Sequence, residues 1–472
     1  MNQRYLNEVN DMLKLETLAF DLPEDVLKRK WAGDFDGEIA LIDALLNKDL
    51  PEMLKERLRV ERRIAELLPG HYCISRARAL EMLRERIPDF QEAELDALEL
   101  DRAVEYIYVK GEKFYLHSFL NTLLKVHPDL AARAGAAVPG ERKALDEAIA
   151  EMKRKGSLAY RIRLHGRLQV NADAFHPGAK ARVHMPLPQR CAQQSQIEVA
   201  PGPDHIDGED ALQRTAYFER TMSENAPFEV EYGYLNEVRY VNPLSGERAA
   251  SPVYPAAPAP TDDDLSEQYP HIAFTPYLKA LAEELKGDET DPVRIAWRFY
   301  EYVTTRIRYS FMRPYFLIDR QAEYCALNGK GDCGIQAILF ITLCRISGIP
   351  ARWQSGLAVD AKSAGCHDWA QFYVEPYGWL FCDPSYGGSA WRAGAEERWR
   401  FYFGNLDPFR MVANSRYQTD FDPPKFCDRA DPYDNQEGEV ELDGVGLTGD
   451  QFETGYTTLE FKRMDEEGYR RI

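Results

Sequence analysis

Three residues whose types and order suit acyl transfer stand in the last third of this 472-residue chain. Cys333 lies in the segment Gly331-Asp332-Cys333-Gly334, His367 follows 34 positions later, and Asp383 follows another 16 positions on. A thiolate can attack a carbonyl carbon, an imidazole can move the proton, and a carboxylate can orient the imidazole. The three residues therefore predict a site that forms a thioester.

The cysteine stands at the expected start of a buried helix. An almost continuous apolar run extends from Cys333 to Ile346, and Ser347-Gly348 and Pro350 supply its end. A first-turn cysteine lies beside unpaired backbone N–H groups and the positive end of the helix dipole, which favour a thiolate. A lone cysteine is more often a small core residue, but the helix start and the downstream histidine and aspartate favour the chemical role.

The histidine and the aspartate belong to a predicted hairpin. The segment HDWAQFYVEPYGWLFCDPS predicts two strands around a turn at Glu375-Pro376-Tyr377-Gly378. A strict four-residue loop would place Ala370, not His367, opposite Asp383, so contact needs a bulge, a different loop or a bend. A structural role for His367 and a plain Asp-Pro turn at Asp383 are the alternatives.

These segments resemble a known family. GDCGIQAILFITLCRISGIPARW, HDWAQFYV and GWLFCDPSYG are similar to the three motifs of the transglutaminase-like superfamily, whose fold is related to papain, over roughly residues 290–390. The resemblance implies a Cys-His-Asp triad of Cys333, His367 and Asp383, with the cysteine helix packed on a sheet that carries the other two. It leaves the substrate open, because the superfamily includes cross-linkers, deamidases, peptidases, peptide N-glycanases and amide-forming enzymes.

The family's oxyanion donor has no clear counterpart in this chain. Papain-like proteases have a glutamine six residues before the cysteine, where this chain has Leu327, and Trp297 fits a helix core better than a transglutaminase-type donor. The backbone N–H of Cys333 is the preferred donor, with side-chain candidates in Tyr309, Gln321 and Asn328. Candidates for a substrate cleft, each of which could equally be a packing residue, are Arg313, Tyr315, Trp353 and Trp369.

The rest of the sequence predicts an α+β protein in three parts. Residues 1–153 have helical spacing of apolar residues, and residues 154–255 contain alternating strands of an antiparallel, sandwich-like β domain that ends in a Pro- and Ala-rich linker. Residues 256–472 then form the transglutaminase-like catalytic domain with a C-terminal extension. The role of the first 250 residues is open; restricting access or binding substrate is one hypothesis.

Composition limits the classes of binding partner and the cellular compartment that we expect. The net charge is -19 and the pI is near 5.1, which argues against nonspecific binding to nucleic acid or to an anionic membrane. Eight sparse cysteines indicate reduced thiols, and no secretory signal or membrane-spanning run is present, so we expect a cytoplasmic protein. The sequence has no metal-binding or nucleotide-binding motif, and we expect neither a metal nor another cofactor.

The combined prediction is a cysteine-dependent hydrolase that cleaves a peptide or isopeptide amide through a thioester on Cys333. An acyltransferase that resolves the same thioester with an amine is the alternative, and a non-catalytic binding module of the same fold is a weaker one. The expected partner is a peptide, a protein or a small amide. The sequence does not predict the oligomeric state.

Overall fold

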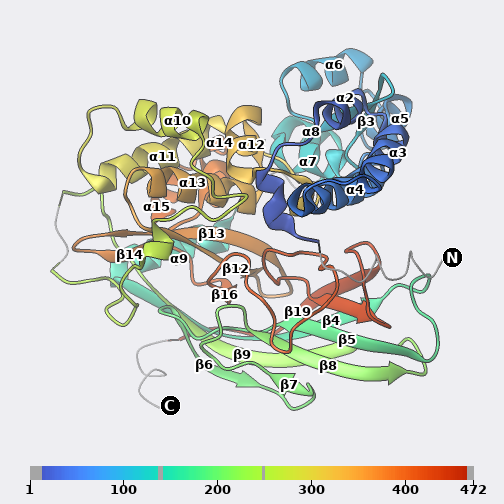
Figure 1. Cartoon of the computed structure of the whole chain (residues 1–472). Coiled ribbons are helices and arrows are strands. Elements are labelled where there is room, and N and C mark those ends of the chain that lie inside the picture. Colours follow the sequence, from blue (N-terminus) through green and yellow to red (C-terminus); the bar gives the residue numbers. More distant parts are fainter. Residues whose placement is uncertain (1–12, 137–141, 247–249, 465–472) are drawn as a thin grey trace.

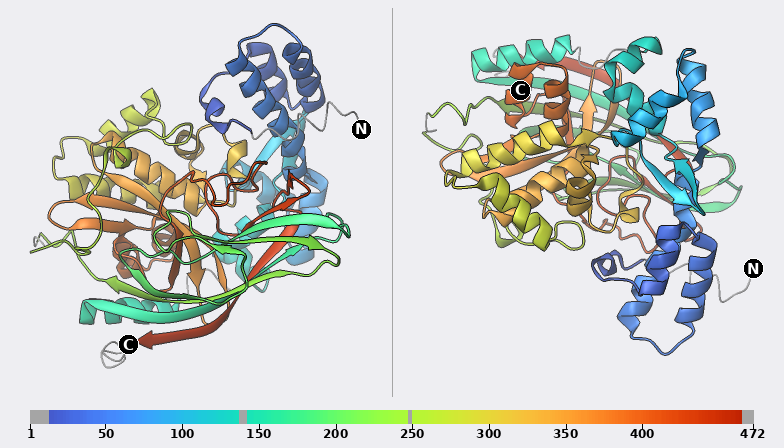
Figure 2. Two further views of the ribbon diagram at one scale, coloured as in Figure 1. Left: turned by 60° about the horizontal axis from the view of Figure 1, so that its bottom comes forward. Right: turned by 90° about the horizontal axis from the view of Figure 1, so that it is seen from above.

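The computed structural model of the chain describes residues 13–136, 142–246 and 250–464. It contains a helical part, a central sheet with helices over one face, and a lower β part (Figure 1). Two further views show the first helices beside the helices of the central sheet (Figure 2). Mixed helix and sheet in this order confirm the predicted α+β class, and residues 1–12 and 137–141 of the predicted helical region lie outside the described residues.

The helical part follows the predicted pattern but also contains a small sheet. Its helices are η1 (Leu15–Ala19), α2 (Glu24–Ala32), α3 (Phe35–Leu46), α4 (Glu52–His71), α5 (Arg76–Arg86), α6 (Glu92–Leu100), α7 (Phe119–Val126), α8 (Pro128–Arg133) and α9 (Lys143–Lys155). The sheet, which helical spacing does not predict, joins β1 (Ile74–Ser75), β3 (Glu112–Tyr115) and β2 (Tyr106–Val109). Lys110 and Gly111 both have positive φ, as in the tight turns that favour hairpins.

The lower β part consists of two antiparallel sheets with a shared core. One has the order β19-β4-β9-β6 and the other β18-β17-β5-β8-β7. The strands are β4 (Ser157–Val170), β5 (Ala179–Pro186), β6 (Gln194–Val199), β7 (His205–Ile206), β8 (Thr215–Met222), β9 (Phe228–Arg239), β17 (Glu439–Leu442), β18 (Val445–Gly446) and β19 (Phe452–Met464). Strands from the C-terminal segment thus complete sheets that begin near residue 157.

The central sheet has the antiparallel order β15-β14-β13-β12-β16. Its strands are β12 (Ala351–Val359), β13 (Ala364–Val374), β14 (Gly378–Cys382), β15 (Phe403–Gly404) and β16 (Arg410–Asn414). The surrounding elements are η2 (Asp262–Asp264), α10 (Pro276–Lys286), α11 (Pro292–Arg306), β10 (Arg308–Tyr309), η3 (Tyr315–Leu317), α12 (Gln321–Asn328), β11 (Lys330–Gly331), α13 (Cys333–Ile346), α14 (Pro384–Arg392) and α15 (Glu396–Phe401).

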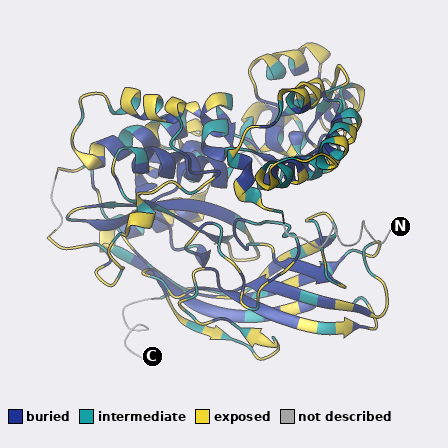
Figure 3. Ribbon diagram, viewed as in Figure 1, coloured by how far each residue is buried: buried dark blue, intermediate teal, exposed yellow. Residues whose placement is uncertain are grey.

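Helix α13 packs on one face of this sheet. Apolar side chains of α13 share a core with Ala370, Phe372 and Val374 of β13, and the rings of Phe340 and Phe372 are 5.7 Å apart. Figure 3 shows that α13 and the strands beneath it are buried, whereas the outer helices have exposed faces. The helix ends before Gly348, which has the left-handed φ of 75° that the sequence predicts for a helix stop.

No helix within the described ranges is long and apolar enough to cross a membrane.

Candidate active site

Cys333 is the first residue of α13, as the sequence predicts. Asp332 caps the helix, because its side chain accepts a hydrogen bond from the backbone N–H of Ile335 at 3.2 Å. The hydroxyl of Tyr315 donates a second hydrogen bond to the same carboxylate at 2.6 Å. The residues after Cys333 are buried, but Cys333 itself is only partly buried. The sulfur therefore lies at the positive end of the helix dipole with a route to solvent.

His367 and Asp383 are in direct contact. Nε2 of His367 lies 2.7 Å from Oδ2 of Asp383, and both side chains are buried. Asp383 also caps α14: it accepts hydrogen bonds from the backbone N–H of Tyr386 at 2.9 Å and from the Ser385 hydroxyl at 3.2 Å. The carboxylate is fixed on three sides, so the imidazole is held in one orientation.

A shorter loop than the four-residue turn makes this contact possible. Val374 pairs with Gly378, so three residues separate the strands, and the pairing of β13 with β14 has no bulge. Ala370 pairs with Cys382, which brings Asp383 to the level of Trp369 rather than Ala370. The chain then leaves the strand to begin α14 at Pro384. The sequence left open a bulge, a different loop or a bend, and the structure has the second of these: a loop of three residues instead of four.

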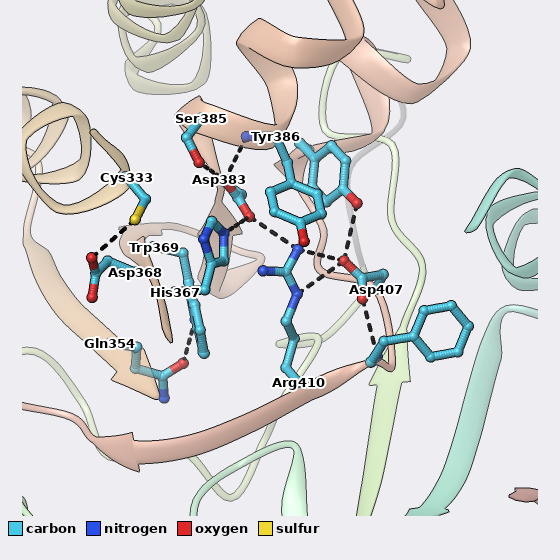
Figure 4. Close-up of polar contacts among 12 residues, drawn as sticks. Cys333, Gln354, His367, Asp368, Trp369, Asp383, Ser385, Tyr386, Asp407 and Arg410 are labelled. Atoms are coloured by element: carbon cyan, nitrogen blue, oxygen red, sulfur yellow. Dashed lines mark hydrogen bonds and ion pairs between the residues drawn. The ribbon is translucent and has the colours of Figure 1, made fainter. Parts of the chain in front are cut away.

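Arg410 completes the charge balance around Asp383. Its guanidinium lies 3.0 Å from Asp383 and 2.5 Å from Asp407, and all three side chains are buried (Figure 4). Burial opposes ionisation of Asp383, yet His367 and Arg410 hold its pKa below the usual range. Burial lowers the pKa of His367, although Asp383 opposes this effect. At neutral pH the imidazole is therefore neutral, with an Nε2–H directed at Asp383 and Nδ1 free to accept a proton.

The thiol of Cys333 donates a hydrogen bond to Asp368, with 3.2 Å between Sγ and Oδ2. Side chains alternate along β13, so Asp368 belongs to the same face as Ala370 and Phe372, which α13 covers. His367 belongs to the other face. Within the described ranges, no hydrogen bond joins Cys333 to His367.

The surroundings of the sulfur favour the protonated thiol. Burial raises the pKa of Cys333 well above its usual value, and the charges of Asp368 and Asp332 raise it further. Burial likewise raises the pKa of Asp368, with further contributions from Asp434 and Asp332. The amide of Gln436 donates a hydrogen bond to the other carboxylate oxygen of Asp368. In this arrangement the cysteine is a thiol at neutral pH.

Cys333 and His367 nevertheless open into one cavity of about 270 Å³. Its walls come from different parts of the chain: Lys125, Val126 and Pro128 of the helical part, Cys366 of β13, and Tyr386 and Arg392 of α14. A small substrate group in this cavity would meet both the sulfur and the imidazole.

The predicted oxyanion donors lie in different places. Tyr309 lines the cavity. Gln321 is buried and accepts a hydrogen bond from the Tyr417 hydroxyl at 2.7 Å, and Asn328 donates to a backbone carbonyl one turn earlier at 2.9 Å. Neither Gln321 nor Asn328 belongs to the described lining of the cavity, whereas the backbone N–H of Cys333 is at the helix start beside it.

The predicted substrate-binding residues also lie outside that described lining. Arg313 takes part in a buried network with the helical part, and Tyr315 holds the carboxylate that caps α13. Trp353 is almost fully buried. Trp369 is buried too, and its indole N–H donates to Gln354 at 2.9 Å. These four side chains form the support behind the site rather than the wall of the cavity.

One group of side chains could in principle hold a cation. His205 of β7, Asp207 directly after it and Asp422 have ligand atoms within 4.8 Å of one another. His205 and Asp422 are exposed, and the group is distinct from the cavity at Cys333. Exposed acidic groups of this kind are common without an ion.

Comparison with known families agrees with the motifs. The model of the transglutaminase-like superfamily matches residues 279–384, a range that contains Cys333, His367 and Asp383. This confirms the resemblance for that segment, which is about a fifth of the chain. No protein with a curated description matches the chain.

Solved structures give weaker likenesses. A candidate cysteine protease from Cytophaga hutchinsonii is 14% identical with a TM-score of 0.39, over 64% of this chain and 98% of that one. The periplasmic domain of TgpA from Pseudomonas aeruginosa is 16% identical with a TM-score of 0.24, over 55% of this chain and 96% of that one.

Several residues of the site were not predicted from the sequence. Asp368 could have been found from strand alternation, because it lies two residues before Ala370 on the face that the helix must cover. Arg410 follows Asp383 by many residues and has no local motif. Lys125 and Arg142 come from the helical part, and only the tertiary fold brings them to Cys333.

Proposed function

We propose that this chain, through its transglutaminase-like segment, is a cysteine-dependent hydrolase that cleaves a peptide or isopeptide amide by way of a thioester on Cys333. One observation carries the proposal: His367, whose Nε2 lies 2.7 Å from the buried Asp383, lines the same cavity as the cysteine at the start of α13. A neutral imidazole with a free Nδ1 beside a thiol is the arrangement that general-base activation of a nucleophile requires.

The first half of the reaction makes the thioester. The Cys333 thiol rotates from its resting contact with Asp368 toward His367 and gives its proton to Nδ1. The sulfur then attacks the carbonyl carbon, the C–S bond forms, and the π electrons move to the oxygen. The backbone N–H of Cys333 and its first-turn neighbours can stabilise this oxyanion. When the C–N bond breaks, His367 returns the proton to the leaving amine.

The second half consumes water. His367 takes a proton from a water molecule, whose oxygen attacks the thioester carbon. The C–S bond breaks, the sulfur recovers the proton from the imidazolium, and the acid product leaves. Asp383 remains ionised throughout and stabilises the imidazolium that forms twice per cycle.

Resolution by an amine is the alternative proposal, and it would make the protein an acyltransferase. An alkyl amine is protonated at neutral pH, and the cations Lys125, Arg142 and Arg392 line the cavity. Like charges disfavour that acceptor and favour water. A binding module without catalysis is less well supported, because such a module has no need of a buried imidazole–carboxylate pair.

The helical part of the chain is placed to control the access of substrates to the cavity at Cys333. The helical part supplies one wall of the cavity through Lys125, Val126 and Pro128, which supports the proposal that it selects substrates.

We also propose a cytoplasmic location, supported by eight free cysteines that a reducing compartment would maintain. Cell fractionation with compartment markers tests the location.

The test uses a panel of peptides and amides in heavy-oxygen water. The expected result is an acyl adduct on Cys333 after acid quench and heavy oxygen in the released carboxyl group, with both lost in Cys333→Ser. Cys366→Ser is a matched control, because Cys366 lines the same cavity, and it should retain both. Cleavage that persists in Cys333→Ser would contradict the proposal. Amide formation with added monodansylcadaverine, without a water product, would favour the acyltransferase.

A further inference from the structure

Three cationic side chains line the cavity beside Cys333. They are Lys125 near the end of α7, Arg142 directly before α9, and Arg392 at the end of α14. Among the described residues that line the cavity there is no aspartate or glutamate. We call Lys125, Arg142 and Arg392 the cationic wall.

Lys125 is held by aromatic rings and a hydroxyl rather than by an acid. Its Nζ donates a hydrogen bond to the Tyr309 hydroxyl at 3.0 Å, and it lies 4.1 Å from the centre of the Tyr309 ring and 4.6 Å from that of Phe311. Burial lowers the pKa of Lys125, and the charge of Arg142 adds to this effect, whereas Cys333 and Asp332 oppose it. The ammonium group lines the same cavity as the sulfur, and no carboxylate among the described residues forms an ion pair with it.

Arg142 and Arg392 also lie among uncharged or cationic neighbours. The guanidinium of Arg142 lies 4.6 Å from the centre of the Tyr386 ring, which is itself 4.6 Å from the imidazole of His367. Burial lowers the pKa of Arg392 to about 10, and the neighbouring Arg308 contributes to the change. Arg392 remains protonated at neutral pH all the same.

The cationic wall is unpaired. None of its three members has a carboxylate oxygen within 4.0 Å in the described part of the chain. Asp332 and Asp368 lie next to the sulfur but do not belong to the cavity lining. This is unusual for a chain with net charge -19, in which acidic partners are abundant. Three like charges around one small cavity repel each other, and an anion that enters relieves the repulsion.

We propose that the cationic wall binds a carboxylate of the substrate, so that the protein acts on amides with a free carboxylate next to the scissile bond. This rests on the proposed hydrolase function and adds the substrate class to it. Arginine forks pair with carboxylates through two parallel hydrogen bonds, and a lysine adds a point charge. An acidic side chain and a C-terminal carboxylate offer the same chemistry, and a cavity of about 270 Å³ accepts either.

The first test compares two alkylating reagents of nearly equal size. Iodoacetate is anionic and iodoacetamide is neutral, so the ratio of their rates at Cys333 reports the local charge without any known substrate. Exposed Cys73 in the same protein is the internal reference. We expect the iodoacetate-to-iodoacetamide ratio to be about tenfold higher at Cys333 than at Cys73, and to fall as salt is added.

Substitutions in the cationic wall test whether it causes the higher iodoacetate-to-iodoacetamide ratio at Cys333. Lys125→Gln and Arg392→Gln should each lower the ratio at Cys333 several-fold. A change in the pKa of Cys333 alters both rates together, so it leaves the ratio unchanged. Arg306→Gln is the control, since Arg306 is an exposed arginine of α11 outside the cavity lining, and it should leave the ratio unchanged. A ratio at Cys333 no higher than at Cys73, or an equal effect of Arg306→Gln, would overturn the proposal.

Substrate turnover then separates this proposal from the hydrolase proposal. Three peptides are compared that differ only beside the scissile bond: glutamate, glutamine, and glutamine followed by a free C-terminal carboxylate. We expect kcat/KM to be about tenfold or more higher for one acidic peptide than for the neutral one, and the better of the two identifies the source of the carboxylate. Equal values for all three would overturn the substrate class but leave the hydrolase intact.

A binding measurement covers the case in which no peptide is cleaved. N-acetyl-glutamate should bind the wild-type protein about tenfold more tightly than N-acetyl-glutamine amide, which has no free carboxylate, in calorimetric titration, and Arg392→Gln should remove the difference. That result would preserve the anion site although hydrolysis had failed. Equal binding of the two compounds would overturn the anion site.

Discussion

The thiol of Cys333 faces Asp368 and not the neighbouring His367: Sγ lies 3.2 Å from the Asp368 carboxylate, on the face of β13 that α13 covers. Because a nearby negative charge stabilises the protonated thiol, this contact works against thiolate formation. The helix dipole at Cys333 acts in the opposite direction. We interpret the contact with Asp368 as a resting state of the cysteine, which substrate entry or rotation of the thiol would release before His367 acts in the proposed reaction.

Asp368→Asn should make Cys333 more acidic. Asparagine keeps the size of the side chain and can still accept the hydrogen bond, but it removes the charge that raises the pKa of the thiol. The midpoint of the pH dependence of iodoacetamide alkylation at Cys333 should move down by about one pH unit or more. Glu437→Gln is the control, because Glu437 accepts a hydrogen bond from Cys366 at 3.5 Å, and it should leave the Cys333 midpoint in place. An unchanged midpoint in Asp368→Asn would contradict the resting-state interpretation.

Asp383→Asn should reduce catalysis by about 10³- to 10⁴-fold, because the imidazolium loses its counter-charge and the tautomer is no longer fixed. Asp383 opposes the burial that lowers the pKa of His367, so this pKa should fall further in the variant. The measurement is kcat/KM against pH on the best peptide. Ser385→Ala removes only a 3.2 Å hydrogen bond to the same carboxylate and should cost less than about tenfold. Similar losses in both variants would mean that Asp383 serves mainly to cap α14.

The parts of the site that local sequence determines were predictable. A helix that starts at Cys333 follows from the apolar run and its cap, and the His367–Asp383 contact follows from the motif order once the loop length is known. The loop was not predictable, because three- and four-residue connections fit the same EPYG segment, and each gives a different register.

The surroundings that set charge could not be predicted from local sequence. Arg410, Lys125 and Arg142 reach the site from elements distant in the chain. Likewise, β17 and β18 return to the sheet that contains β5, and β19 returns to the sheet that contains β4. The oxyanion candidates Gln321 and Asn328 precede Cys333 closely in the sequence, but Gln321 accepts a hydrogen bond from Tyr417 and Asn328 donates one to the backbone of its own helix. Nearness in sequence is a poor guide when the site lies between three parts of the fold.

Arg410→Met should destabilise the protein by about 3–5 kcal/mol, because it leaves Asp383 and Asp407 buried without their cation. Urea denaturation measures the free energy of unfolding, and Arg410→Lys should fall between the wild type and Arg410→Met. Arg400→Gln is the control, since it removes an exposed pair with Glu396 and should cost less than about 1 kcal/mol. Equal stability of Arg410→Met and the wild type would show that the buried arginine does not compensate the two carboxylates.

Asp434→Asn should stabilise the protein at neutral and higher pH but not in acid. Burial raises the pKa of Asp434 from near 3.8 to about 6, with Glu437 adding to the effect, and hydrogen bonding with Ser355, the charge of Arg429 and hydrogen bonding with Asp368 opposing it. A pKa that is higher in the folded state gives stability that is fully present below about pH 4 and is lost as the pH rises through about 6.

Asparagine cannot ionise, so the variant should avoid that loss and gain roughly 1–3 kcal/mol over the wild type at about pH 8, with little difference at about pH 4. The free energy of unfolding in urea at the two pH values is the measurement. Asp420→Asn, an exposed aspartate, is the control and should change neither value. A gain of equal size at both pH values would mean that the effect comes from hydrogen bonding or packing rather than from the titration of Asp434.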